Sequence, residues 1–308
     1  MEKLIVSSSP HLRSGESTGG IMLDVAFALL PAAVAGIAIF GPRAAAVLGV
    51  CILFAVLSEA VWELIFKKPI SISDGSAVVT GLLLGMNLSP LVPLWMAALG
   101  SMIAIVIVKQ MFGGLGQNFA NPAITARIVL MVSFPTAMTT WAEPFAWRSE
   151  IDTLSSATPL AAGADAFTYR ELLLGLSGGC IGETCALLLL AGGAYLVFRR
   201  VITPTIPLSF IATVAICSLC AGADPIKAIL SGGLLLGAIF MATDYVTSPY
   251  TFKGQLIFGI GCGLITFVIR QFGNLPEGVS FSILLMNLLV PHINRLTRPK
   301  PFGSEGAK

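Results

Sequence analysis

Ten apolar runs, separated by charged residues, glycine or proline, fill most of this 308-residue chain. They lie at 25–40, 44–66, 76–88, 92–111, 122–135, 178–198, 206–222, 226–242, 255–269 and 280–293. The chain is 56% hydrophobic and only 11% charged, whereas soluble domains carry about a quarter charged residues. The sequence therefore predicts an all-α integral membrane protein with about ten transmembrane helices.

Several of these runs are short for a membrane crossing. They hold 13 to 17 residues, which reach about 20–25 Å at ~1.5 Å per residue, less than the hydrocarbon core of ~30 Å. Short helices joined by irregular backbone are tolerated only where they face protein or a water-filled cavity. The runs at 76–88 and 122–135 are therefore predicted to be broken half-helices around an internal site.

The positive charges predict the topology. If the N-terminus is cytoplasmic and each run crosses once, twelve Lys and Arg residues lie inside and five lie outside, as the positive-inside rule expects. Both termini are then cytoplasmic. The predicted organisation is a cytoplasmic N-terminal segment 1–20, a first membrane repeat 21–135, an extracytoplasmic loop 136–177, a second membrane repeat 178–296 and a cytoplasmic tail 297–308.

Two pairs of segments suggest that the halves are related. Ala77–Gly85 resembles Ala228–Gly237, and Ile107–Gly113 resembles Val268–Gly273. In the ten-crossing topology Lys109 lies inside and Arg270 outside, which predicts two inverted five-helix repeats. Such repeats place binding sites at their interface, near broken helices. The alternative is a chance similarity between helices rich in glycine and leucine.

The extracytoplasmic loop carries a cluster of small hydroxyl residues on what we expect to be an exposed turn. Its sequence is Asp152-Thr153-Leu154-Ser155-Ser156-Ala157-Thr158-Pro159-Leu160. Pro159 favours extended backbone at Thr158, whose hydroxyl could then point into a cleft. Composition alone is equally typical of an ordinary loop.

Carboxylates at membrane depth are costly and suggest ion or proton handling. Those in or near apolar runs are Asp24, Glu59, Glu63, Asp74, Glu183 and Asp244. Asp244 and Asp74, in corresponding halves, are the preferred ion-coupling residues, although a position at a helix end explains several of the six equally well. His11 and His292, the only histidines, are far apart, which excludes a multi-histidine metal site. The net charge of +2 without a basic face argues against nucleic acid as a partner.

Several motifs resemble a known family in their order and spacing. They are Ser8-Ser9-Pro10-His11, Ile21–Asp24, Asp74-Gly75-Ser76, Thr80–Leu83, Lys109–Asn118, Asn121-Pro122-Ala123, Met241–Asp244 and Thr247-Ser248-Pro249. Together they run nearly from end to end of the chain. The chain resembles the family that contains the D subunit of the Rnf ferredoxin:NAD+ oxidoreductase complex and the B subunit of the sodium-pumping NADH:quinone reductase.

The resemblance implies a covalent FMN. In that family, a flavin transferase that uses FAD joins FMN by a phosphoester bond to a threonine in a motif matched here by Asp152, Ser155, Ser156, Ala157, Thr158 and Pro159. Thr158 matches the attachment position and Asp152 the upstream acid. Ser156 stands where glycine is frequent in the family, and we expect the modification to tolerate this small residue.

The segment from Gly113 to Pro122 is a second candidate site. Its glycines let the backbone approach a ligand, and Pro122 suits the first turn of a helix. Asn118 and Asn121 could hydrogen-bond a flavin edge, and the related sodium-pumping reductase holds a non-covalent riboflavin. The alternative is a tight loop in which Asn121 caps a half-helix. This loop is predicted to be cytoplasmic, opposite Thr158, so two flavins would form an electron path across the membrane.

The resemblance implies a membrane electron-transfer subunit of an ion-translocating ferredoxin:NAD+ oxidoreductase complex, moving Na+ or H+, in the cytoplasmic membrane of a bacterial or archaeal cell. The implied partners are the other Rnf subunits, including an extracytoplasmic FMN-bearing subunit, and the flavin transferase that matures the chain. No nicotinamide or iron–sulfur motif is evident, so the chain would be catalytically incomplete alone. From the residues, a secondary transporter or channel for a small polar solute suits inverted broken helices equally well, and a non-redox scaffold protein is a further alternative.

Overall fold

The computed structural model describes residues 17–68, 71–148, 158–162, 167–183, 185–273 and 278–299. Within these ranges the regular structure is helical and contains no β-strand. Four helices are long and apolar enough to cross a membrane: α1 (Thr18–Phe40), α2 (Pro42–Ile65), α13 (Phe252–Phe272) and α14 (Val279–Thr297). The all-α membrane fold predicted from the apolar runs is therefore confirmed.

Five further apolar helices are shorter. They are α3 (Ser76–Met86), α4 (Leu94–Met102) with its π-helical continuation η2 (Ile103–Gln110), α5 (Pro122–Ser133), α9 (Ala186–Phe198) and α10 (Thr205–Cys220). α3 has 11 residues and α5 has 12, so each is about 16–18 Å long. The prediction of half-helices at 76–88 and 122–135 is confirmed.

The predicted run at 226–242 is not one helix. It consists of α11 (Pro225–Leu230), α12 (Leu234–Leu236) and the π-helical segment η6 (Gly237–Met241). Short elements occupy the connections: η1 (Ile72–Asp74), α6 (Pro135–Met138), η3 (Ala146–Arg148), α7 (Pro159–Ala162), α8 (Tyr169–Leu174) and η5 (Ile181–Glu183). The run at 226–242 is thus a broken helix, of the kind that membrane proteins tolerate around internal sites.

The run predicted at 178–198 is α-helical only from Ala186 onward, which corrects its N-terminal boundary. The Ile181 N–H donates to the Leu88 carbonyl at 3.0 Å. A Cβ added to Gly182 would lie 2.7 Å from the Met86 Cβ, so backbone approaches backbone here. The segment before α9 therefore bonds to the end of α3 instead of continuing α9 toward the N-terminus.

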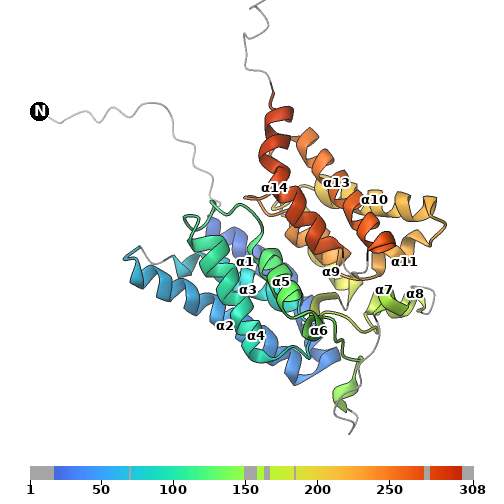
Figure 1. Ribbon diagram of the computed structural model, residues 1–308, viewed down its shortest axis with the longest axis horizontal. Coiled ribbons are helices and arrows are strands. Elements are labelled where there is room, and N and C mark those ends of the chain that lie inside the picture. Colours follow the sequence, from blue (N-terminus) through green and yellow to red (C-terminus); the bar gives the residue numbers. More distant parts are fainter. Residues whose placement is uncertain are drawn as a thin grey trace, which may run out of the picture.

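The helices form two groups that correspond in order. In Figure 1, α1 to α5, coloured blue to green, lie beside the group formed by α9 to α14, coloured yellow to red. The first helices of the two groups, α1 and α9, pack against each other, and so do the last helices, α5 and α14. On α9, Gly192 meets the Ala28 backbone of α1 so closely that a Cβ would collide with it. Small residues allow this close packing between membrane helices.

The two resembling segments enter the protein from opposite ends and meet near its centre. α3 begins with Ser76 beside Lys109 and ends with Met86 beside Gly182. In the second half, Ala228 lies beside Arg270, and Leu236 reaches Gly182, where an added Cβ would lie 3.0 Å from its Cδ2. The corresponding cations Lys109 and Arg270 therefore mark opposite ends of the protein, as inverted repeats require.

Candidate functional site

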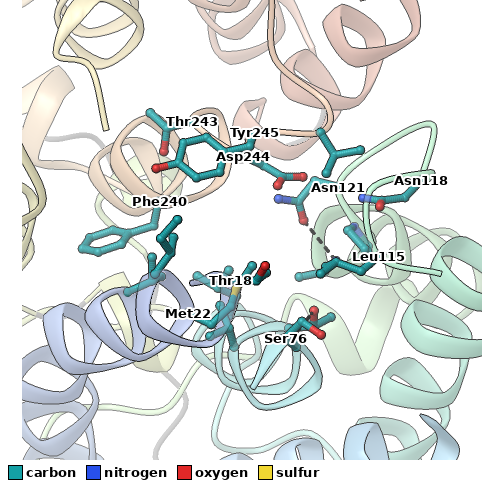
Figure 2. Close-up of a pocket in the computed structure, with 18 of the residues that line it drawn as sticks. Thr18, Met22, Ser76, Leu115, Asn118, Asn121, Phe240, Thr243, Asp244 and Tyr245 are labelled. Carbon is teal, nitrogen blue, oxygen red and sulfur yellow. Dashed lines mark hydrogen bonds between the residues drawn. The ribbon is translucent and has the colours of Figure 1, made fainter. Parts of the chain in front are cut away.

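A cavity of about 330 Å³ lies between the two halves at the Lys109 end. Its walls come from α1, α3, the loop before α5 and the segment 240–246 of the second half, and they are mostly apolar. Figure 2 shows polar side chains from both halves around one space: Thr18, Ser76, Asn118, Asn121, Thr243 and Asp244. Cofactor sites are commonly concave and apolar, with a few polar groups that fix the orientation of the ligand.

The glycine-rich loop turns sharply before it reaches the cavity. Gly113, Gly114 and Gly116 have φ angles of 125°, 102° and 89°, which L-residues with a side chain rarely adopt. The loop ends at Asn118, which is 9% exposed and lines the cavity. These glycines let the loop turn toward the cavity, and a binding role for the loop stays a prediction.

Asn121 has the capping role considered as an alternative. Its Oδ1 accepts hydrogen bonds from the N–H groups of Ala123 at 3.1 Å and Ile124 at 3.2 Å, and Pro122 occupies the first helical position of α5. Its Nδ2 donates to the Met241 carbonyl at 3.2 Å. One side chain thus caps a half-helix and joins the two halves beside the cavity.

An Asn121→Ala variant is expected to unfold about 2 kcal/mol more easily, because it loses both the cap and the hydrogen bond to Met241. Asn121→Ser is the matched control, since serine also caps helices but does not reach Met241, and we expect a loss of about 1 kcal/mol. Unfolding by a denaturing detergent in mixed micelles measures both values. Equal losses would mean that the Met241 bond contributes nothing.

A buried polar network lies behind the cavity wall. The Lys109 Nζ donates to Glu59 Oε1 at 2.5 Å and to Ser76 Oγ at 2.6 Å. Lys109 is 2% exposed and Glu59 is 0% exposed. Asp74 accepts from the N–H and the hydroxyl of Ser76, at 2.8 Å and 2.5 Å. Asp74 therefore supports the start of α3 and reaches the cavity only through Ser76.

Both π-helical segments lead into the cavity. η2 carries Lys109, and η6 carries Phe240 and ends just before Thr243 and Asp244. π turns are uncommon and occur frequently at functional sites, because they rotate the following side chains out of the α-helical register. Asp244 lines the cavity, and its Oδ2 accepts from the Thr247 hydroxyl at 3.0 Å.

Thr158 lies at the opposite end, directly before α7, in which Pro159 is the first residue. Thr158 is only 3% exposed, which corrects the expectation of an exposed turn at this residue. Leu160 packs beside Gly232, between α11 and α12. A Cβ added to Gly232 would lie 2.6 Å from the Leu160 Cδ1. This packing holds α7 against α11 and α12. Asp152, Ser155, Ser156 and Ala157 lie outside the described residues.

Arg270 lies beside Leu160. The same hypothetical Cβ on Gly232 would be 3.2 Å from Arg270 Nη2. The guanidinium donates to the carbonyls of Ala228 at 2.8 Å and Ser231 at 2.9 Å, and its buried Nε has no partner among the described residues. Arginine binds phosphate well. An orphaned arginine donor beside Leu160, which follows Thr158 by two residues, therefore suits a phosphate anion at this end.

The residues that flank the segment containing Thr158 are hydrogen-bonded to neighbouring helices. The Trp147 Nε1 donates to the Ile39 carbonyl of α1 at 3.1 Å. The Tyr169 hydroxyl donates to Asp224 at the start of α11, and this bond lowers the pKa of the Asp224 carboxyl. Trp147 and Tyr169, on either side of the segment that contains Thr158, thus bond to α1 and to the start of α11.

The fold and the two sites define a polytopic helical membrane protein with an internal cofactor-sized cavity between inverted halves. The chain belongs to the NQR2, RnfD, RnfE family, whose model matches residues 5–303.

Named relatives match over nearly their whole length. The chain is 51% identical over 308 residues to the D subunit of the Na(+)-translocating ferredoxin:NAD(+) oxidoreductase complex of Acetobacterium woodii, covering 97% of this chain and 95% of the relative. It is 46% identical over 319 residues to the D subunit of the proton-translocating ferredoxin:NAD(+) oxidoreductase complex of Clostridium ljungdahlii, with coverage of 97% and 96%. It is 35% identical over 344 residues to the D subunit of the ion-translocating oxidoreductase complex of Escherichia coli, with coverage of 97% and 98%.

The structure brings Asn118, Asn121 and Asp244 together in one cavity and keeps Thr158 at the other end. The sequence predicted Lys109 and Arg270 to lie in resembling segments on opposite sides of the membrane, but it did not assign either side chain to a candidate site. The resemblance between the segments around them was the available signal, since corresponding cations in inverted repeats lie at corresponding binding regions.

Proposed function

We propose that this chain is the membrane electron-transfer component of an ion-translocating ferredoxin:NAD+ oxidoreductase complex. It carries FMN as a phosphoester on Thr158 and a non-covalent riboflavin in the cavity. The observation that supports the proposal is that the cavity and Thr158 lie at opposite ends of one bundle of broken helices. The names of the relatives support the complex and its ferredoxin and NAD+ reactions.

The residues at each end fit the group proposed there. At the first end, the Thr158 hydroxyl oxygen would form the phosphoester and the orphaned Arg270 donor would pair with the phosphate. At the other end, apolar walls would enclose the ring, and Asn118, Asn121 and Lys109 would offer hydrogen bonds to its polar edge. A flavin supplies the one-electron chemistry, while the protein fixes its position and electrostatics.

The proposal extends to topology and partners. The Thr158 end is extracytoplasmic and both termini are cytoplasmic, in the inner membrane of a bacterial or archaeal cell. Electrons pass between the flavins from an extracytoplasmic FMN-bearing partner toward cytoplasmic carriers. Ion movement is coupled to these steps, with Asp244, which lines the cavity, and Asp74, behind Ser76, as candidate coupling residues.

The cavity flavin is tested by filling the cavity. Thr80 lines it from α3, and a Thr80→Trp variant is expected to lose one riboflavin per purified complex, because an indole occupies the space of the ring. Val132→Trp, at a position 70% exposed on α5, is the control that should keep it. Flavins released by acid are identified by chromatography, which separates riboflavin from FMN. Equal riboflavin in wild type and Thr80→Trp would contradict the assignment.

A transporter or channel for a small polar solute is the second candidate, favoured by a cavity that lies between inverted halves. The same purification separates the two functions. A complex that holds neither riboflavin nor covalent FMN in this chain, but transports a solute in vesicles, would support the transporter.

A further inference from the structure

Lys109, the buried lysine beside the cavity, has one N–H donor that no hydrogen bond to the described residues uses. An ammonium group has three N–H donors, and the hydrogen bonds of the described residues engage two of them, with Glu59 and Ser76. Lys109 and Ser76 both line the cavity, and Figure 2 shows Ser76 facing its interior. A negative charge on a ligand there would therefore attract the Lys109 ammonium.

The buried charge of Glu59 is compensated by Lys109. The Glu59 Oε1 accepts from Lys109 at 2.5 Å and from the Gln110 Nε2 at 2.9 Å. Its Oε2 is buried and has no partner among the described residues, and the side chain is 0% exposed. A buried carboxylate with one bare oxygen persists only while a cation compensates its charge.

Other charged groups near α2 do not take over this role. On α2, the Arg43 guanidinium donates to the carbonyls of Pro90 and Leu91, and Glu63 accepts from Ser71. On the elements packed against α2, Asp24 of α1 pairs with Arg199, and Asp74 of η1 accepts from Ser76. Lys67 and Lys68 follow α2 on the exposed surface, and α3 and α4 carry no charged residue. Lys109 is therefore the cation that balances Glu59.

We propose that Glu59 and Lys109 form a redox-linked proton-uptake site beside the cavity. This inference rests on the flavin proposed for the cavity. When one electron reaches that flavin from the FMN proposed on Thr158, the added negative charge would draw the Lys109 ammonium toward the cavity. Glu59 loses its compensating charge and takes up one proton from water. One electron and one proton thus enter together, Lys109 keeps all its protons, and oxidation reverses both steps.

A proton is the cation that this geometry favours. Proton binding needs only the bare Oε2 of Glu59, whereas a metal cation needs several oxygen ligands at once. The described residues contain no cluster of three or more His, Cys, Asp or Glu side chains that could hold a metal ion. Uptake at Glu59 would couple electron arrival to proton movement within this one chain.

Infrared difference spectroscopy tests the proposal on the assembled, flavin-loaded complex. The reduced-minus-oxidised spectrum is expected to show a new C=O band of a protonated carboxyl group, shifted in deuterium oxide. Glu59→Gln is expected to remove this band. Glu63→Gln is the matched control, because Glu63 lies on the same helix, is 2% exposed and bonds Ser71, away from the cavity lining; it should keep the band.

A second pair of variants guards against a folding defect in Glu59→Gln. Lys109→Met leaves Glu59 protonated in both redox states, so the difference band should vanish, whereas Lys109→Arg keeps the charge and should keep the band. A wild-type spectrum without the band, or a band unchanged in Glu59→Gln, overturns this inference and leaves the flavin assignments standing. A complex that lacks the non-covalent flavin overturns the cavity assignment and, with it, this inference.

Discussion

A Thr158→Ala variant is expected to carry no covalent flavin, while wild type, made together with its own flavin transferase, fluoresces under ultraviolet light in the denatured band of about 32.2 kDa. The reason is chemical, because a phosphoester bond needs the hydroxyl oxygen that alanine lacks. The effect is therefore expected to be all-or-none. In-gel fluorescence, normalised to the amount of protein, measures it directly.

Two controls belong with that experiment. Thr158→Ser keeps a hydroxyl and should retain part of the signal. Ser156→Gly restores the residue frequent in the family and should keep the full signal. Fluorescence that persists in Thr158→Ala would move the attachment to another residue. Because Thr158 is buried and precedes α7, each variant also needs to elute like wild type in detergent.

Lys109→Met is expected to destabilise the chain by about 3–5 kcal/mol, the usual cost of removing one partner of a buried ion pair. The cost arises because Glu59, which is 0% exposed, loses the cation that compensates its charge and has no other ion pair among the described residues. Detergent-induced unfolding of the two proteins in mixed micelles measures the effect.

The double variant Glu59→Leu, Lys109→Met is the control for this prediction. Two apolar residues of similar size often match or exceed a buried ion pair in stability, so most of the loss should return. A double-mutant cycle then isolates the coupling between the two side chains. A Lys109→Met variant as stable as wild type would show that the pair contributes no stability.

The sequence was sufficient for the membrane fold and the half-helices, while the division into two repeats stays a prediction. Apolar runs and glycine or proline boundaries are local signals, so they marked α3 and α5 correctly. The start of α9 was predicted too early, because Ile181 bonds the Leu88 carbonyl of a distant segment. Such long-range hydrogen bonds leave no periodic pattern in the sequence.

The candidate sites were predictable only in part. Asn118 and Asn121 lie on a loop with recognisable glycine and proline signals, and both line the cavity. The pairing of Glu59 with Lys109 joins residues 50 positions apart. Lys109 lies on the π-helical segment η2, and no residue pattern predicted that segment. The position of α7 likewise depends on a contact between Leu160 and Gly232, which are far apart in the chain.

Mass spectrometry of the peptide that contains Thr158, taken from the chain purified within its complex, tests the central claim most directly. An electron carrier of the proposed kind should show this peptide heavier by FMN less one water, with the added mass on Thr158. A peptide with unmodified Thr158 throughout the population, from cells that express the flavin transferase, would contradict the account.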